Sequence, residues 1–313
     1  MNASNQNGQW PGGPAQPGAL QARRASTFLR RVASFVVLWA VVLGAVFSGN
    51  PLVANCLFVL LITAVGVAGQ LEFYGLVKRR GLACFKWLGV VGGTALMWST
   101  CAKCLSSAGA DHFGDFQTGV LACIVLGLCV RQLIAGLNQT GLTAISTTLL
   151  GVLYVPWLLN FIQGINFFPG LGGMGKYYLL YFLVVTKLSD TGAYLVGTLL
   201  GRHKLAPRIS PAKTWEGFIG AIAVAVVSSV LAAQIAGPYL PGMDTLDALV
   251  LGAALGLGAV AGDLIESLFK REAGVKDSGG LLPGIGGVLD LLDSVLFNAP
   301  IMYLYIQHVL ARP

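Results

Sequence analysis

The chain has 313 residues, of which 55% are hydrophobic and 11% are charged, and its mean hydropathy is +0.74. This composition excludes a soluble globular domain, and apolar runs of about 20 residues recur along the chain, which favours an all-α bundle of membrane-spanning helices over a barrel. The net charge of +7 comes from basic residues in short loops, so it indicates membrane topology or anionic lipid and nucleotide partners, with no nucleic acid.

The N-terminal segment 1–22 consists largely of Asn, Gln, Gly, Pro and Ala without periodicity, and this composition predicts disorder. We extend the disordered tail to residues 1–31 and expect one polytopic transmembrane domain over 32–313. We expect no cleavable signal peptide, because the first apolar run begins only after a group of arginines.

About nine spans are expected, and the basic residues test their number. If the N-terminus is cytoplasmic, sixteen Lys and Arg residues lie in inner loops and three lie in outer loops. This bias follows the positive-inside rule, so it places the loops that carry the motifs below in the cytoplasm. The expected spans lie near 32–48, 51–76, 86–105, 118–136, 142–163, 177–200, 215–236, 246–269 and 288–309.

The six cysteines lie in or beside apolar runs. Cys101 and Cys104 form a CxxC, but the second pair or the histidines that a zinc site needs are missing. We therefore expect the cysteines to act as small hydrophobic residues.

Asp190 is a carboxylate about halfway along the expected span 177–200. One interpretation is an intramembrane ion pair with Lys187, three residues earlier on the same helix face. The other is a carboxylate that lines a substrate cavity, because charged groups inside a membrane are costly and usually functional.

The loop 201–217 is basic and leads into the next helix. A solvated cytoplasmic loop would have this composition. Ser210, Lys213 and Thr214, however, sit where a helix is expected to begin, and backbone N–H groups beside a lysine make a phosphate site. We favour phosphate binding.

The segment 262–294 gathers acids, bases and glycines into one turn between two apolar helices. Salt bridges such as Glu266 to Lys270 are the structural interpretation, but they do not explain why so many aspartates surround one glycine-rich turn. Carboxylates such as Asp263 and Asp277 are hard oxygen ligands, which suit Mg²⁺ better than zinc. The mixture of acids and bases indicates metal-chelated phosphates as substrates.

A long signature runs through this C-terminal segment. Two positions depart from it, since Ile285 stands where the signature has histidine and Leu291 where it has arginine. The segments 190–194 and 204–217 and the acidic-aromatic pair at Glu72 add to the same pattern. The signature residues in register are Ser267, Lys270, Arg271, Lys276, Asp277, Pro283, Gly286, Gly287, Asp290 and Asp293.

On these residues the chain resembles the phosphatidate cytidylyltransferase family, also called CDP-diacylglycerol synthases. The resemblance implies an enzyme of phospholipid biosynthesis that condenses CTP with phosphatidate to give CDP-diacylglycerol and pyrophosphate. It also implies Mg²⁺ or a similar divalent cation, a homodimer in the lipid bilayer, and a catalytic part over about 177–313. We expect a bacterial inner membrane with the active site on its cytoplasmic side.

The resemblance further implies roles for individual residues. Asp263 and Asp277 would hold the metal. The catalytic set would be Lys270, Arg271, Lys276, Asp290 and Asp293, in which the basic residues meet phosphate groups and the two aspartates support the site. The substrate-binding set would be Asp190, Ser210, Lys213, Thr214 and Ser267.

Two other functions stay open. The departures at Ile285 and Leu291 allow a catalytically weakened or retired homologue that binds or transports lipid, although the paired broken helices of a transporter are not evident. A related nucleotidyltransferase could use an isoprenoid-ether phosphate, while a polyprenol-phosphate enzyme would show a DDxxD motif, which the sequence lacks.

Overall fold

The computed structural model describes residue 40, residue 44 and residues 49–105, 113–280 and 286–310. The predicted tail and most of the predicted first span, near 32–48, lie outside this part of the chain. The described helices are α2 (Pro51–Arg79), α3 (Lys86–Leu105), α4 (Phe113–Ala135), α5 (Gly141–Val152), α6 (Leu158–Asn166), α7 (Gly175–Leu200), α8 (Trp215–Ile235), α9 (Thr245–Glu272) and α10 (Val288–Tyr305).

Seven helical segments among the described residues are long and apolar enough to cross a membrane. One of them joins α5 to α6 through a π-helical turn, η2 (Leu153–Trp157), which contains Pro156. The chain is therefore an all-α polytopic membrane protein, as predicted. Short helical turns at Pro169–Leu171, Gly237–Tyr239 and Ile306–Leu310 complete the helical structure.

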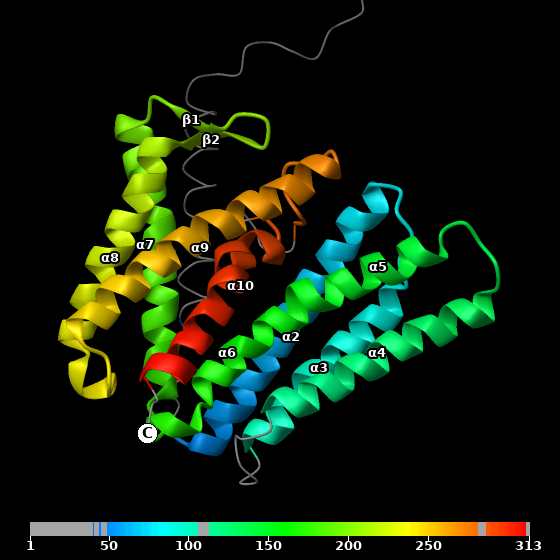
Figure 1. The fold of residues 1–313 in the computed structure, drawn as a ribbon, viewed down its shortest axis with the longest axis horizontal. Helices are drawn as coiled ribbons and strands as arrows, with labels where there is room; N and C mark the ends of the chain where they lie inside the picture. The colour runs from blue at the N-terminus through cyan, green and yellow to red at the C-terminus, as the bar shows by residue number, and fades with distance from the viewer. Residues whose placement is uncertain (1–39, 41–43, 45–48, 106–112, 281–285, 311–313) are drawn as a thin grey trace, which may run out of the picture.

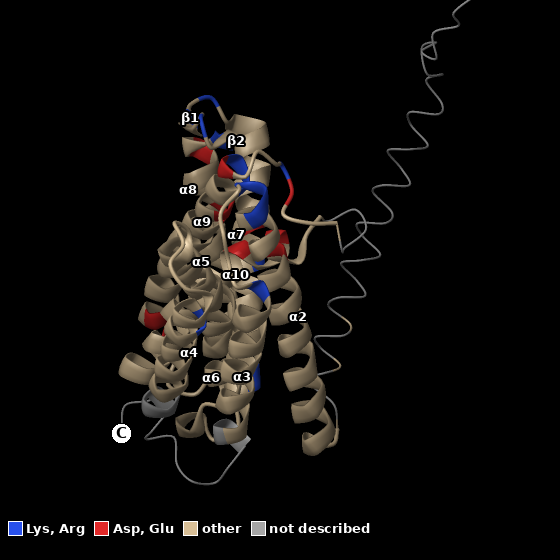
Figure 2. Cartoon of the chain, turned by 90° about the vertical axis from the view of Figure 1, so that its right-hand side faces the viewer, with Lys and Arg blue, Asp and Glu red and all other residues tan. Residues whose placement is uncertain are grey.

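The helix α10 lies between two groups of helices (Figure 1). On one side it packs against α9, which packs in turn on α8 and α7; on the other it contacts α6 and α2, beyond which lie α3, α4 and α5. The charged residues gather at the end of the molecule that carries the two strands (Figure 2). The rest of the bundle is predominantly uncharged, as a membrane-embedded surface requires.

The basic loop between α7 and α8 forms an antiparallel hairpin of strands β1 (Lys204–Ala206) and β2 (Ser210–Thr214). The carboxylate of Glu216 accepts hydrogen bonds from the backbone N–H groups of Arg202 and His203, at 3.1 and 3.2 Å, and so fixes the base of the hairpin. Thr214 caps α8, because its Oγ1 accepts from Gly217 N at 3.1 Å. Since α8 begins at Trp215, Ser210 and Lys213 precede the helix on β2.

Two glycine pairs on α9 bring different neighbours close to it. A methyl group at Gly252 would lie 2.8 Å from Ser229 of α8, and one at Gly256 would lie 3.0 Å from the backbone of the same helix. On the other face, a methyl group at Gly258 would meet Asn298 of α10, and one at Gly262 would meet the carbonyl oxygen of Asp293. These pairs therefore serve close helix packing, as their small-xxx-small spacing predicted.

A buried polar network fixes the lower-numbered helices to one another. The Tyr74 hydroxyl donates to the carbonyl of Thr148 at 2.8 Å, and the Gln70 amide donates to the carbonyl of Gly89 at 2.9 Å. These bonds join α2 to α5 and α3 inside the apolar bundle, where an unpaired polar group would be costly. Gln70 and Tyr74 lie on either side of Glu72, so these bonds fix the part of α2 that carries this acid.

Replacement of Gly262 by leucine tests this packing. We expect Gly262→Leu to lower the melting temperature in detergent, since overpacking a close helix contact costs about 1–3 kcal/mol. The control is Gly127→Leu on α4, where an added side chain would meet nothing within 4 Å. Equal melting temperatures for the two variants would contradict the close approach of α9 and α10.

Candidate active site

Three acidic side chains from α9 and α10 form a compact group at the charged end. One carboxylate oxygen from each of Asp263, Glu266 and Asp293 lies within 4.8 Å of the others. Asp263 and Glu266 share a face of α9 because they are three residues apart, and the contact at Gly262 brings Asp293 against that face. Like charges at this separation repel, so the arrangement favours a bound cation.

Glu266 gives the clearest sign of a ligand. Its side chain is 0% exposed, and its Oε1 has no hydrogen-bond partner among the described residues. A buried, unsatisfied carboxylate oxygen is costly unless something outside the chain pairs with it. The three oxygen donors therefore fit a hard divalent cation such as Mg²⁺.

Lys270 joins the acidic group to the start of α10. Its ammonium group donates to Glu266 Oε2 at 3.0 Å, which confirms the expected i, i+4 pair, and to Asp290 Oδ1 at 2.7 Å. The side chains of Lys270 and Asp290 are each 12% exposed. This pairing holds the end of α9 against the beginning of α10.

Asp290 organises the glycine-rich loop in front of α10. Its Oδ2 accepts from Gly287 N at 2.8 Å and from Ser278 N at 3.1 Å. A carboxylate at this position stabilises both the loop and the N-terminus of the helix. Asp290 thus holds the loop to the start of α10, and its catalytic role stays a prediction.

Glu72 of α2 reaches the same loop from the other half of the bundle. Its Oε2 accepts from the Ser278 hydroxyl at 3.0 Å and from Leu289 N at 2.9 Å, and its Oε1 has no partner among the described residues. A methyl group at Gly279 or at Gly287 would collide with this carboxylate. Glu72 was not among the predicted site residues, although a lone acid near the end of an apolar span was the signal for it.

Asp190 takes part in both of the arrangements proposed from the sequence. It forms the predicted ion pair with Lys187, at 3.3 Å, and it also accepts from the Ser294 hydroxyl of α10 at 2.9 Å. The same carboxylate lines a cavity beside the acidic group. The ion pair and the cavity position are therefore compatible.

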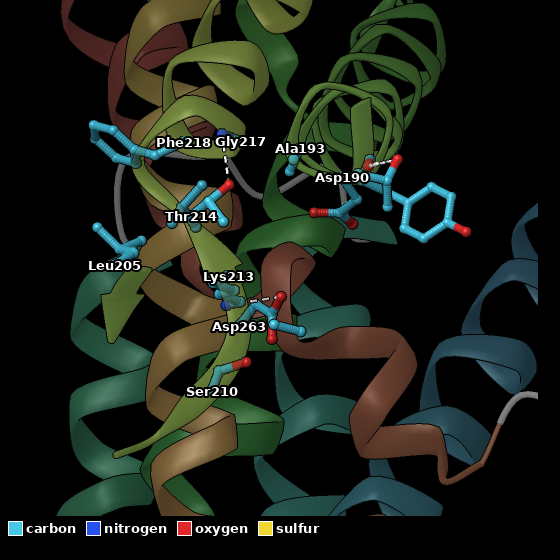
Figure 3. A pocket seen from close by; sticks show the side chains of 14 residues that line it. Asp190, Ala193, Leu205, Ser210, Lys213, Thr214, Gly217, Phe218 and Asp263 are labelled. Atoms are coloured by element: carbon cyan, nitrogen blue, oxygen red, sulfur yellow. Dashed lines mark hydrogen bonds and ion pairs between the residues drawn. The ribbon is translucent and has the colours of Figure 1, made fainter. Parts of the chain in front are cut away.

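The cavity, of about 330 Å³, lies where α7, α8, α9 and the hairpin meet (Figure 3). Lys213 of β2 and Asp263 of α9 face each other in it, with Nζ 2.8 Å from Oδ2. The Lys213 Nζ atom is buried, so this ion pair places a positive charge directly beside the acidic group. Ser210 and Thr214 also line the cavity, next to apolar side chains such as Phe218.

The remaining predicted residues lie around this centre. The Ser267 hydroxyl donates to Asp263 Oδ1 at 3.3 Å. Arg271 donates to the carbonyls of Ile209 and Val275, each at 3.1 Å, and so ties the hairpin to the end of α9. Lys276 and Asp277 are exposed on the loop between α9 and α10.

The structure groups the acids differently from the pair proposed from the sequence. Asp263 belongs to the compact group, but its companions there are Glu266 and Asp293 rather than Asp277. The metal role of Asp277 stays a prediction. Of the two departures from the signature, Leu291 lies on α10, and Ile285 falls outside the described residues.

Comparison with known proteins gives the family. The sequence model of the family described as "Cytidylyltransferase family" matches residues 29–309 of this chain. These residues include the helices α2 to α10 and both strands. The chain belongs to this family. The predicted resemblance is confirmed.

Two relatives each align with this chain over most of its length and most of their own length. The phosphatidate cytidylyltransferase of Bacillus subtilis is 33% identical over 270 residues, covering 85% of this chain and 95% of the relative. That of Mycobacterium leprae is 32% identical over 302 residues, covering 92% and 93%. An Escherichia coli protein, YnbB, is 42% identical over 134 residues, but the alignment covers only 43% of this chain and 44% of that protein.

Removal of single carboxylates tests the acidic group as a divalent-cation site. We expect Glu266→Gln and Asp293→Asn to weaken Mn²⁺ binding to the purified protein on the order of tenfold or more, because each removes one charged oxygen donor. Titration calorimetry measures the change. The control is Asp244→Asn, at the N-cap of α9, where asparagine caps as well as aspartate. Unchanged Mn²⁺ binding in both site variants would contradict the assignment.

Proposed function

We propose that this protein transfers a cytidylyl group from CTP to phosphatidate, giving CDP-diacylglycerol and pyrophosphate. The observation that carries the proposal is the acidic group of Asp263, Glu266 and Asp293, next to which Lys213 lines a cavity at the charged end of the bundle. Membership of the cytidylyltransferase family and the two relatives named phosphatidate cytidylyltransferase support this substrate pair.

The reaction joins two polyanions, so neutralisation of charge is the main task of the site. A phosphate oxygen of phosphatidate attacks the α-phosphorus of CTP, a new P–O bond forms, and the bond to the β-phosphate breaks with the departure of pyrophosphate. Lys213 and Lys270 offset negative charge on the reacting phosphates. No covalent enzyme intermediate is needed, because phosphatidate is itself the nucleophile.

We assign the divalent cation to Asp263, Glu266 and Asp293, whose oxygen donors fit Mg²⁺. When bound, Mg²⁺ would neutralise phosphate charge and polarise the P–O bonds. Asp290 and Glu72 hold Ser278 and the first residues of α10 together, at the two ends of the glycine-rich segment.

The cavity suits a substrate with one anionic and one apolar part. Lys213, Ser210 and Thr214 offer polar groups, while Phe218 and Tyr194 line the same space with aromatic rings. Tyr194 is largely exposed on the outer surface of α7, where lipid would surround it. We propose that phosphatidate reaches the cavity sideways from the bilayer and that CTP arrives from the aqueous side.

The membrane arrangement completes the proposal. We infer about nine spans with a cytoplasmic N-terminus, a disordered tail over 1–31 and a homodimer in a bacterial inner membrane. The charged end would then face the cytoplasm, in agreement with the sixteen-to-three distribution of basic residues. The catalytic part comprises about 177–313, and Glu72 of α2 supports it from outside this range.

An assay of the purified protein tests the reaction. We expect labelled CTP, phosphatidate and Mg²⁺ to give CDP-diacylglycerol and pyrophosphate, and we expect EDTA to abolish the product because the acidic group then loses its cation. Thin-layer chromatography of the lipid fraction measures the product. Absence of product under these conditions, from protein that is folded and binds Mn²⁺, would refute the proposed function and favour a retired homologue.

The exposed loop carboxylate Asp277 is tested in the same assay. We expect Asp277→Asn to remove nearly all transfer activity, as the signature resemblance implies, while the protein stays folded and inserted. Mn²⁺ titration of this variant then shows whether Asp277 shares the cation with Asp263. Turnover at the level of the unmodified protein would sink the assignment of Asp277 to the metal site.

A further inference from the structure

Lys187 is a cation within the helix α7 that the reaction described above does not use. Its side chain is 25% exposed, and its ammonium group has three partners. It lies 3.3 Å from Asp190 Oδ2 on its own helix, and it donates at 3.0 Å to both the Ser294 hydroxyl and the carbonyl of Leu291 on α10. A lysine at this depth in a membrane protein needs such partners to remain charged.

These contacts join α7 to the first two turns of α10. The Ser294 hydroxyl accepts from Lys187 and donates to Asp190, which closes a triangle of three polar side chains. Asp293, the neighbour of Ser294, contributes its carboxylate to the acidic group. Any shift of this part of α10 therefore moves one carboxylate of the proposed cation site.

Lys187 also balances the charge of the site. Four carboxylates, those of Asp263, Glu266, Asp290 and Asp293, are joined through the acidic group and through the ammonium groups of Lys213 and Lys270, and the Lys187–Asp190 pair adjoins them through Ser294. With all groups ionised, the formal excess is two negative charges, which one divalent cation neutralises. Without Lys187 the excess would be three.

Position 291 offers a second place for the same charge. Leu291 and Ser294 lie three residues apart on α10 and so share a face of the helix. Since Ser294 contacts Asp190, a cationic side chain at 291 would face the same carboxylate from α10. The signature that the chain resembles has arginine at this position, whereas this chain has Leu291 there and Lys187 on the opposite helix.

We propose that Lys187 is a positioning residue that supplies from α7 the positive charge missing at position 291. It holds Asp190 and the first turns of α10 in register, and so keeps Asp293 at the cation site for cytidylyl transfer. This inference rests on the proposed function. It differs from a purely structural ion pair, because it assigns the charge of Lys187, and not only its packing, to the reaction.

Three variants separate these roles. We expect Lys187→Met to lower kcat roughly 100-fold, as small displacements of a reacting group do, with little change in the KM for CTP. We expect Lys187→Arg to keep most of the activity because it keeps the charge. In the double variant Lys187→Met/Leu291→Arg we expect kcat to recover at least in part. The control is Lys176→Met, the same change in the first turn of α7.

Mn²⁺ binding gives a readout that packing alone would not move. We expect Lys187→Met to bind Mn²⁺ more tightly, on the order of tenfold, because a nearby positive charge is removed from the acidic group. The inference is overturned if Lys187→Met matches the unmodified protein in kcat, or if neither Lys187→Arg nor the double variant retains more activity than Lys187→Met. If Lys187→Met does not fold, Lys187→Arg is compared with the unmodified protein instead, and a loss of kcat of roughly 100-fold in this variant overturns the inference.

The two proposals fail differently. If the unmodified protein forms no CDP-diacylglycerol, the proposed function fails, and unchanged Mn²⁺ affinity in Lys187→Met would then refute the electrostatic role of Lys187 as well. If the unmodified protein is active and Lys187→Met is equally active, only the inference about Lys187 fails.

Discussion

The close approach of α9 and α10 is the constraint on which the site depends. Gly262 leaves room for the backbone of Asp293, and this contact turns two acids on one helix and one acid on the next into a single group. A cluster of three carboxylates has a high electrostatic cost at the edge of a membrane. The cost is offset by Lys213 of β2, which lies 2.8 Å from Asp263, and by Lys270 of α9, which lies 3.0 Å from Glu266. Lys187 of α7 pairs with the neighbouring Asp190 at 3.3 Å.

Each of these lysines also serves a mechanical purpose. Lys270 fastens the end of α9 to the start of α10, Lys213 fastens the hairpin to α9, and Lys187 fastens α7 to α10. The fold therefore uses the same ion pairs to neutralise the site and to fix the helices that form it. In the proposed reaction, this coupling would preorganise the positions that receive phosphate charge.

Much of the helical layout and part of the site could be predicted from the sequence. The expected spans from 51–76 onward agree with the helices, and the pairs Lys187–Asp190 and Glu266–Lys270 follow from their spacing on one helix. The hairpin of β1 and β2 was missed, because two strands of three and five residues around a proline carry little periodic signal. The grouping of Glu266 and Asp293 depends on how two helices face each other, which the spacing within each helix does not determine.

The contacts of Glu72 have a consequence for how the protein is made. Its bonds to Ser278 and Leu289 join residues 206 and 217 positions apart in the chain. During synthesis α2 leaves the ribosome before Ser278 and Leu289 have been made. The Glu72 carboxylate therefore lacks these two partners until α10 is inserted. The contact that joins α2 to the start of α10 can therefore form only after α10 has been synthesised, and a nascent chain without α10 lacks it.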